Sequence, residues 1–90
     1  MNKSIEDSSI KNDQYIQIGT NLRRARESRG VRAQELILKL NLLGIEINSY
    51  SLSKIEANRQ HIKASQLKGV LKVLDCSIDE LLYSENDFME

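Results

Sequence analysis

Residues 44–58, GIEINSYSLSKIEAN, decide the fold of this 90-residue chain, because they contain a helix end, a turn and a new helix start. Gly44 is suited to end one helix, since glycine adopts the left-handed conformation without steric cost. Side chains that favour helix starts follow within a few positions. These are Asn48, Ser49 and Ser51. The stretch therefore predicts a turn and then a short helix at about 49–57.

The predicted helix 49–57 has two different faces. Leu52 and Ile55 are three positions apart, so they share the face that packs on a core. Side chains with hydrogen-bonding groups occupy the opposite face: Ser49, Tyr50, Ser53 and Lys54. A helix with an anchored back and a polar front fits the major groove of DNA, although a solvated surface helix has the same pattern.

Apolar residues at helical spacing predict two helices before this stretch. The first, at about 16–29, has a basic last turn and is followed by Gly30 as its C-terminal cap. The second, at about 32–43, has leucines at intervals of four and three. Residues 45–47, IEI, alternate apolar and acidic side chains, so we expect this connection to pack against the core.

Two further helices are predicted after the stretch. The helix at about 64–74 carries a full apolar stripe and contains Gly69, which indicates close packing against a neighbour. Asp75 then forms a turn, and residues 77–80, SIDE, fit a capping box that opens a fifth helix. The predicted fold class is therefore all-α, a compact five-helix bundle. The extended second helix and the third helix are joined by an extended connection that contains Gly44. Together they fit a helix-turn-helix.

Composition and length limit the alternatives. The chain contains no proline and only four Tyr or Phe residues, which favours helices over a sheet sandwich. We expect residues 1–14 to be a flexible arm, 15–83 the folded domain and 84–90 an acidic tail with Phe88 and Met89 exposed. No apolar run is long enough to cross a membrane, and the N-terminal residues lack a signal-peptide core. We therefore expect a cytoplasmic protein without a membrane partner.

Charge is unevenly distributed although the formal net charge is zero. Residues 18–64 contain nine Lys or Arg against four Glu, a net charge of +5. Residues 65–90 contain two Lys against six acids, a net charge of −4. Because a polyanion responds to the local field, the basic middle favours nucleic acid as a partner.

The residues that usually carry enzyme or metal chemistry are sparse. His61 is the only histidine and lies in a polar stretch without Cys, His or paired carboxylates at ligand spacing. Cys76 is the only cysteine, so no internal disulfide forms, and we expect it to fill a small buried gap. No nucleophile has a neighbouring base, and no glycine-rich phosphate loop occurs. We expect no enzyme activity, no metal and no cofactor.

Four segments together resemble the phage-repressor-like (XRE-type, lambda-repressor-like) helix-turn-helix family. They are IGTNLRRARESRGV at 18–31, QELILKL at 34–40, SLSKIEANR at 51–59 and LKGVLKVLDCSIDELL at 67–82. Their order and spacing, more than any one segment, carry the likeness, which covers about residues 18–82. The resemblance implies a DNA-binding domain whose third helix enters the major groove, as a homodimer on double-stranded DNA with a two-fold site.

The resemblance also implies roles for individual residues. The groove-facing, base-contacting positions of the family are occupied by Asn48, Ser49, Tyr50, Ser53 and Lys54. Arg59 occupies a phosphate-contact position just past the third helix. Arg26 and Glu56 stand where the family has a buried ion pair that joins the first helix to the third.

Three features depart from the family pattern. Arg32 and Ala33 replace the usual Ser or Thr followed by Gln, so the second helix lacks a cap and the glutamine that contacts the DNA backbone. We expect Arg32 to supply a phosphate contact instead. The link from Leu40 to Asn48 is longer than the commonest form, and Asn58 replaces a glycine. Asn58 is compatible with this helix end, because asparagine tolerates the left-handed conformation.

Two functions fit these observations. The leading expectation is a sequence-specific transcriptional regulator of the repressor type, because the middle of the chain is basic and the third helix is polar. The alternative is a non-catalytic protein-interaction module of the same fold, antitoxin-like or partner-binding, that uses the acidic tail or the segment 42–47. Ala33 and the neutral net charge favour this alternative. Tyr50 either contacts a base or phosphate or packs against the 45–47 connection.

Overall fold

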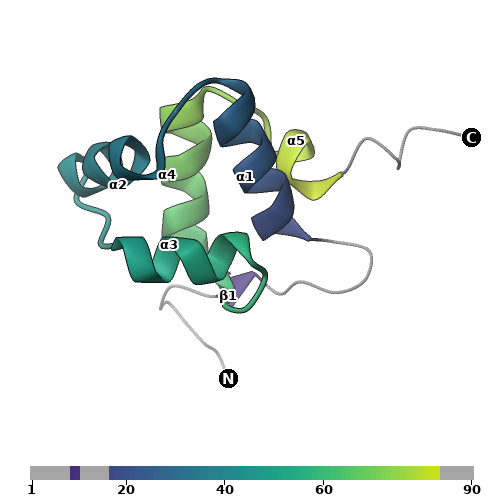
Figure 1. Cartoon of the computed structure of the whole chain (residues 1–90), viewed down its shortest axis with the longest axis horizontal. Helices are drawn as coiled ribbons and strands as arrows, with labels where there is room; N and C mark the ends of the chain where they lie inside the picture. Colours follow the sequence, from purple (N-terminus) through teal and green to yellow (C-terminus); the bar gives the residue numbers. More distant parts are fainter. Residues whose placement is uncertain (1–8, 11–16, 84–90) are drawn as a thin grey trace, which may run out of the picture.

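A computed structural model describes residues 9–10 and 17–83, and these are mostly helical (Figure 1). The described part contains the helices α1 (Ile18–Ser28), α2 (Ala33–Leu42), α3 (Ser49–Glu56), α4 (Ala64–Leu74) and α5 (Ile78–Leu82). It also contains two short strands, β1 (Ser9–Ile10) and β2 (Ile62–Lys63). The all-α class is therefore confirmed, and each helix boundary lies within two residues of the predicted one where both are described.

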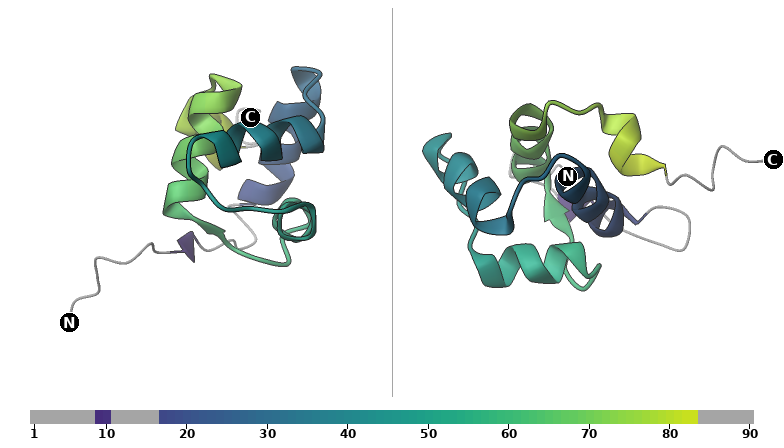
Figure 2. Two further views of the ribbon diagram at one scale, coloured as in Figure 1. Left: turned by 90° about the vertical axis from the view of Figure 1, so that its left-hand side faces the viewer. Right: turned by 45° about the horizontal axis from the view of Figure 1, so that its top comes forward.

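The helices surround one core. α3 contacts both α1 and α2, α2 also packs against α4, and α5 packs against α1 on the opposite side of the molecule (Figures 1 and 2). Aliphatic side chains with at most 1% of their surface exposed come from every helix: Ile18, Leu22, Ala25, Leu36, Leu40, Leu52, Ile55, Val70 and Leu81. The burial of each large side chain among them stabilises the folded state by roughly 1.5–3 kcal/mol. α3 is thus part of the core on one side and open on the other.

The connection between α2 and α3 is packed, as the alternation of residues 45–47 predicted. Gly44 has a φ of +84°, which turns the chain out of α2. Ile47 is buried and Ile45 packs against the core. Gly69 of α4 permits this approach, because a Cβ atom there would lie 2.8 Å from Leu40 Cδ2 and would also collide with Ile45. The expected close packing at Gly69 is confirmed.

Two residues of the expected flexible arm 1–14 form a short strand that pairs with residues near α4. Ser9–Ile10 form β1, which pairs antiparallel with β2 in the register Ser9 to Lys63 and Ile10 to Ile62. The prediction missed this pairing because two residues give no periodic signal. Ile62, expected in a polar loop, is only 1% exposed. The other residues of the expected arm and the expected tail 84–90, with Phe88 and Met89, lie outside the described residues.

The predicted capping box at 77–80 is wrong. Ser77 is the N-cap of α5, but its side chain makes no capping hydrogen bond. Glu80 instead accepts two hydrogen bonds from Arg29, with Nη1–Oε2 at 2.7 Å and Nη2–Oε1 at 2.9 Å. The charged guanidinium is a stronger partner for a carboxylate than a neutral backbone N–H.

Among residues 17–83, no helix has both the length and the apolar character needed to cross a membrane.

Candidate nucleic-acid interface

α3 exposes the polar face that its sequence predicted. Leu52 and Ile55 are each 1% exposed and anchor the helix. Tyr50 is 71% exposed on the opposite side. Ser49 and Ser53 are exposed as well, and Lys54 is partly exposed. The orientation follows from helical geometry, since each residue turns the chain by about 100° and two buried positions fix the outward direction of the others.

Asn48 has a role in the helix start that limits its part in recognition. Its Oδ1 accepts a hydrogen bond from the Ser51 N–H at 2.8 Å, which makes it the N-cap of α3. Such a cap stabilises a helix by roughly 1 kcal/mol. Because this hydrogen bond fixes the side chain against the helix start, Asn48 is held in one orientation, with its Nδ2 amide not used by the cap.

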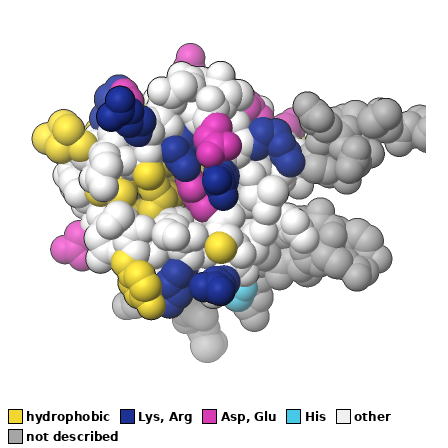
Figure 3. All heavy atoms as spheres, in the orientation of Figure 1, with side chains coloured by type: hydrophobic (Ala, Val, Ile, Leu, Met, Phe, Trp, Pro, Cys, Tyr) yellow, Lys and Arg dark blue, Asp and Glu magenta, His cyan; other side chains and the backbone are white. Residues whose placement is uncertain are grey.

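Tyr50 and Lys54 form a pair on the outer side of α3. The Lys54 Nζ atom lies 4.9 Å from the centroid of the Tyr50 ring, within the range of a cation–π interaction. The alternative in which Tyr50 packs against the 45–47 connection is wrong, because most of the ring is exposed. Figure 3 shows Lys and Arg side chains next to a hydrophobic one along this edge of the molecule.

Arg26 and Glu56 form the ion pair expected between α1 and α3. Arg26 Nε donates to Glu56 Oε2 at 2.8 Å, and Nη2 donates to Oε1 at 2.8 Å. The remaining Nη1 donates to the carbonyl of Val31 at 2.9 Å. The hydrogen bonds that Arg26 donates to Glu56 raise the pKa of Arg26, and both side chains are about nine-tenths buried. The pair therefore holds the inner side of α3 at a fixed distance from α1.

A second contact between α1 and α3 depends on Gly19. A Cβ atom at this position would collide with the carbonyl oxygen of Ile55 and would lie 2.6 Å from Asn58 Oδ1. Asn58, whose φ is 60° as expected for a left-handed helix end, donates from Nδ2 to Thr20 Oγ1 at 2.6 Å. This contact was not predicted from the sequence. Its only sequence signal is a glycine inside a helix, where glycine costs roughly 1 kcal/mol.

A cleft lies between α1, the first turn of α2 and α3. Ser49 and Ser53 line it from α3, Arg23 lines it from α1, and the Arg26–Glu56 pair is part of its wall. Tyr50 and Lys54 are not among its lining residues. The polar front of α3 is thus divided into a serine side next to the cleft and a Tyr50–Lys54 side that faces outward.

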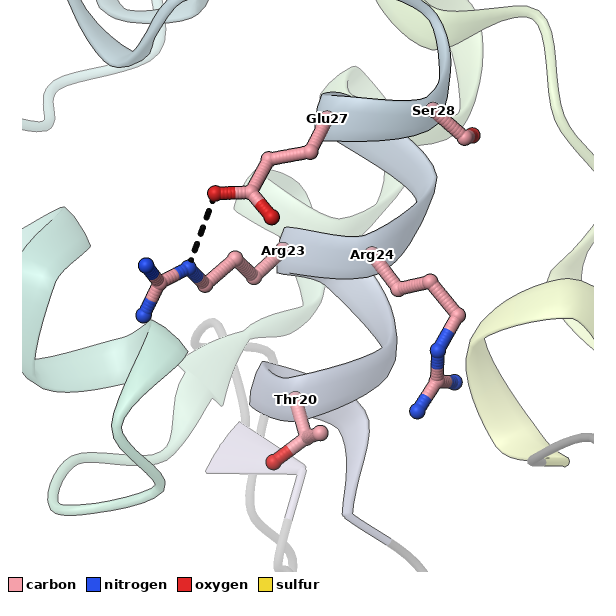
Figure 4. Close-up of a pocket in the computed structure, with 5 residues that line it drawn as sticks. All are labelled: Thr20, Arg23, Arg24, Glu27 and Ser28. Atoms are coloured by element: carbon pink, nitrogen blue, oxygen red, sulfur yellow. Dashed lines mark hydrogen bonds and ion pairs between the residues drawn. The ribbon is translucent and has the colours of Figure 1, made fainter.

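The cations of α1 are already engaged (Figure 4). Arg23 Nε lies 3.0 Å from Glu27 Oε2, one helical turn away. Arg24 points to the other side of α1 and donates from Nη1 to Asn21 Oδ1 at 2.9 Å. A groove between these side chains runs along the outer surface of α1. Its charge is partly neutralised, so we do not assign it to the interface.

The two expected phosphate contacts, Arg32 and Arg59, are both exposed. Arg32 is the N-cap of α2 and makes no capping hydrogen bond, in agreement with the lost cap. Arg59 follows α3, and its N–H donates to the carbonyl of Lys54 at 2.8 Å. Both guanidinium groups are without an ion-pair partner among residues 17–83.

His61 and Cys76 are the only histidine and the only cysteine of the chain. His61 is exposed, and residues 17–83 contain no cluster of three potential metal ligands. Cys76 is half-buried against the core, and burial raises the pKa of its thiol.

No protein-family model, curated protein or solved structure matches the chain. The geometry of α3 and its neighbours is therefore the basis for a function.

Proposed function

We propose that the protein is a sequence-specific DNA-binding transcriptional regulator, of the repressor type, that inserts α3 into the major groove. In this proposal α2, the connection 43–48 and α3 constitute a helix-turn-helix. A homodimer would place two copies of α3 one helical turn of DNA apart on a two-fold site.

The observation that carries the proposal is the exposed polar front of an otherwise anchored α3. An α-helix with its side chains is about 10–12 Å in diameter, and the major groove is about 12 Å wide and accepts one helix. α3 lies at an edge of the molecule, and no other described helix covers its outer side (Figures 1 and 2). A helix held in this way is able to enter a groove without a change in the core.

Each side chain of the front has a chemistry suited to one part of DNA. The Lys54 ammonium is a donor for the O6 and N7 acceptors of guanine, and the Tyr50 ring offers apolar contact to a thymine methyl group. Ser49 and Ser53 are able to donate or accept toward either base pair. The unengaged guanidinium groups of Arg32 and Arg59 are suited to phosphates, which fix the position of the domain but not its sequence preference.

A protein-interaction module is the second candidate, and the exposed leucines of α2 favour it. Leu38 is 59% exposed, Leu42 77% and Leu43 45%. Such a cluster is a possible contact for a protein. Of the segment 42–47 considered from the sequence, Leu42 and Leu43 are exposed, whereas Ile47 is buried. The leucines do not explain the polar front of α3, and we therefore place this function second.

The test is selection of binding sites from a pool of random duplexes by the full chain, followed by fluorescence anisotropy on a selected and a scrambled duplex. We expect the selected duplex to bind at least about 1,000-fold more tightly. Lys54→Ala should weaken the selected complex. The matched control is Lys72→Ala, which changes an exposed lysine of the last turn of α4. The C-terminal end of α4 lies away from α3 (Figure 1). Absence of any enriched duplex would overturn the proposal.

A further inference from the structure

Tyr50 and Lys54 are one helical turn apart and present two different chemistries side by side. Tyr50 is 71% exposed, and the Lys54 Nζ lies 4.9 Å from the centroid of its ring. No carboxylate forms an ion pair with Lys54 within residues 17–83. The ammonium therefore keeps its charge available, while the ring holds it in place.

The contact with the Tyr50 ring restricts the conformations of the Lys54 side chain. A free lysine side chain samples many rotamers, and ordering it on binding has an entropic cost. A cation–π contact favours the rotamers that keep Nζ near the ring. The part of the ring surface that Lys54 does not cover remains open to solvent and to an apolar group. A ligand of this pair therefore needs a hydrogen-bond acceptor and an apolar group a few ångströms apart.

We propose that Tyr50 and Lys54 together recognise one step of stacked base pairs, a 5-methylpyrimidine next to a guanine. This inference rests on the proposed function and names its ligand. Successive base pairs are stacked about 3.4 Å apart, so a ring and an ammonium 4.9 Å apart are close enough together to contact two neighbouring pairs. Thymine presents a C5-methyl group to the major groove, and guanine presents O6 and N7. 5-Methylcytosine has its methyl group at the same ring position as thymine.

A phosphate is a poorer ligand for the pair. It would satisfy Lys54, but it would leave the exposed aromatic ring of Tyr50 next to a charged, strongly hydrated group. Arg32 and Arg59 already supply exposed cations that suit phosphates. The serines on the cleft side of α3 contribute no apolar surface. The Tyr50 hydroxyl is also able to donate to a phosphate, but only the base step offers an apolar group to the ring and an acceptor to the ammonium at the same time.

The experiment uses the full chain and a duplex enriched from a random pool. In that duplex the thymine of each T–G step is replaced by uracil, by cytosine or by 5-methylcytosine, and the guanine by 7-deazaguanine. Uracil lacks only the methyl group, and we expect it to weaken wild-type binding about fourfold, the effect of one buried methyl group. 5-Methylcytosine should bind more tightly than cytosine. 7-Deazaguanine lacks the N7 acceptor and should weaken binding roughly three- to tenfold.

Variants separate recognition by the pair from independent contacts. Tyr50→Ala should be insensitive to the loss of the methyl group and should also discriminate less against 7-deazaguanine, because the lysine is no longer held. Tyr50→Phe keeps the ring and should retain both preferences. Lys54→Met should lose only the preference for guanine. Thermal unfolding should show that these surface variants remain folded, and Lys72→Met is the matched control.

The outcomes distinguish this inference from the proposed function. If a specific duplex is enriched but Tyr50→Ala keeps the wild-type response to uracil, the assignment of the base step is wrong and DNA binding stands. The same holds if the enriched duplexes contain no 5-methylpyrimidine–guanine step. If no duplex is enriched at all, both proposals fail.

Discussion

At position 26 one guanidinium group connects three parts of the chain. Arg26 bonds to Glu56 through two nitrogens and to the carbonyl of Val31 through the third. Its α1 position, the turn after α1 and the end of α3 are thereby held together. Because the pair is buried, removal of one partner leaves a charge without compensation.

We predict that Arg26→Ala and Glu56→Ala each lower the free energy of unfolding by roughly 3–5 kcal/mol. The double variant Arg26→Met, Glu56→Leu should recover much of the loss, since no lone charge is then buried. Urea denaturation of the four proteins measures both effects. A single variant as stable as the wild type would contradict the structural role of the pair.

Recognition and positioning should also separate at single residues. We expect Lys54→Ala and Tyr50→Ala each to cost roughly 1–3 kcal/mol on the selected duplex and less on random DNA. Arg59→Ala should weaken both complexes by a similar factor and lower the salt slope by about one. Anisotropy titrations of both duplexes across a salt series measure these effects. Equal losses for Lys54 and Arg59 on both duplexes would mean that α3 is only a basic surface.

At the scale of elements, α3 and α5 are both placed by contacts with α1. Gly19 lets the end of α3 approach α1, and Arg29 holds α5 through Glu80 and also donates to the carbonyl of Leu74 at 2.8 Å. Asn21 adds a hydrogen bond from Nδ2 to the carbonyl of Leu81 at 2.8 Å. α1 is therefore the element against which α3 and the last helix are aligned.

Gly19→Ala should destabilise the protein although alanine favours helices. The new Cβ atom would collide with a backbone carbonyl, which cannot rotate away like a side chain. We expect a loss of roughly 1–3 kcal/mol in the free energy of unfolding, as for an overpacked core. Ser28→Ala, at an exposed position of the same helix, is the control. Denaturation midpoints measure both, and a more stable Gly19→Ala variant would contradict the close approach.

The contact of α5 with α1 should depend on pH. The hydrogen bond from Arg29 lowers the pKa of Glu80 from its usual 4.5, so the folded state binds this proton less readily than the unfolded chain. Its contribution is present above the unfolded pKa and is lost as the pH falls through the lower folded pKa. Glu80→Gln should therefore melt at a lower temperature than the wild type near neutral pH, and the gap should close in acid.

Thermal unfolding between about pH 7 and pH 3 tests this dependence. The effect should be small, because Glu80 is partly exposed and solvent screens the pair. Glu27→Gln is the matched control, since it removes an exposed ion pair within α1 alone. A constant gap between Glu80→Gln and the wild type at every pH would show that the carboxylate does not hold α5.

For the whole molecule, the separation of charge predicts a salt-dependent complex with DNA. If the basic middle contacts roughly four to six phosphates per subunit, the logarithm of affinity should fall linearly with the logarithm of salt concentration. The slope should be roughly −4 to −5 per subunit. Anisotropy on a random duplex measures it. A flat response would favour the protein-interaction module, with α2 and its exposed leucines as the first surface to examine.

The sequence alone determined where most helices begin and end and which side of α3 faces outward. Periodic apolar residues such as Leu52 and Ile55 record these properties locally, and Gly44 and Asn58 mark turns by their own conformational preferences. The Arg26–Glu56 pair was expected only from the resemblance to a family, since 30 positions separate its members.

Only the tertiary structure decided which long-range partner each polar side chain takes. Glu80 has the spacing of a capping box, yet Arg29 lies within reach and binds it instead. The exposure of Tyr50 and the need for glycine at position 19 are settled in the same way, by neighbours that are distant in sequence. Local pattern fixes the direction of a side chain from its own helix, whereas the group it meets depends on how the helices pack.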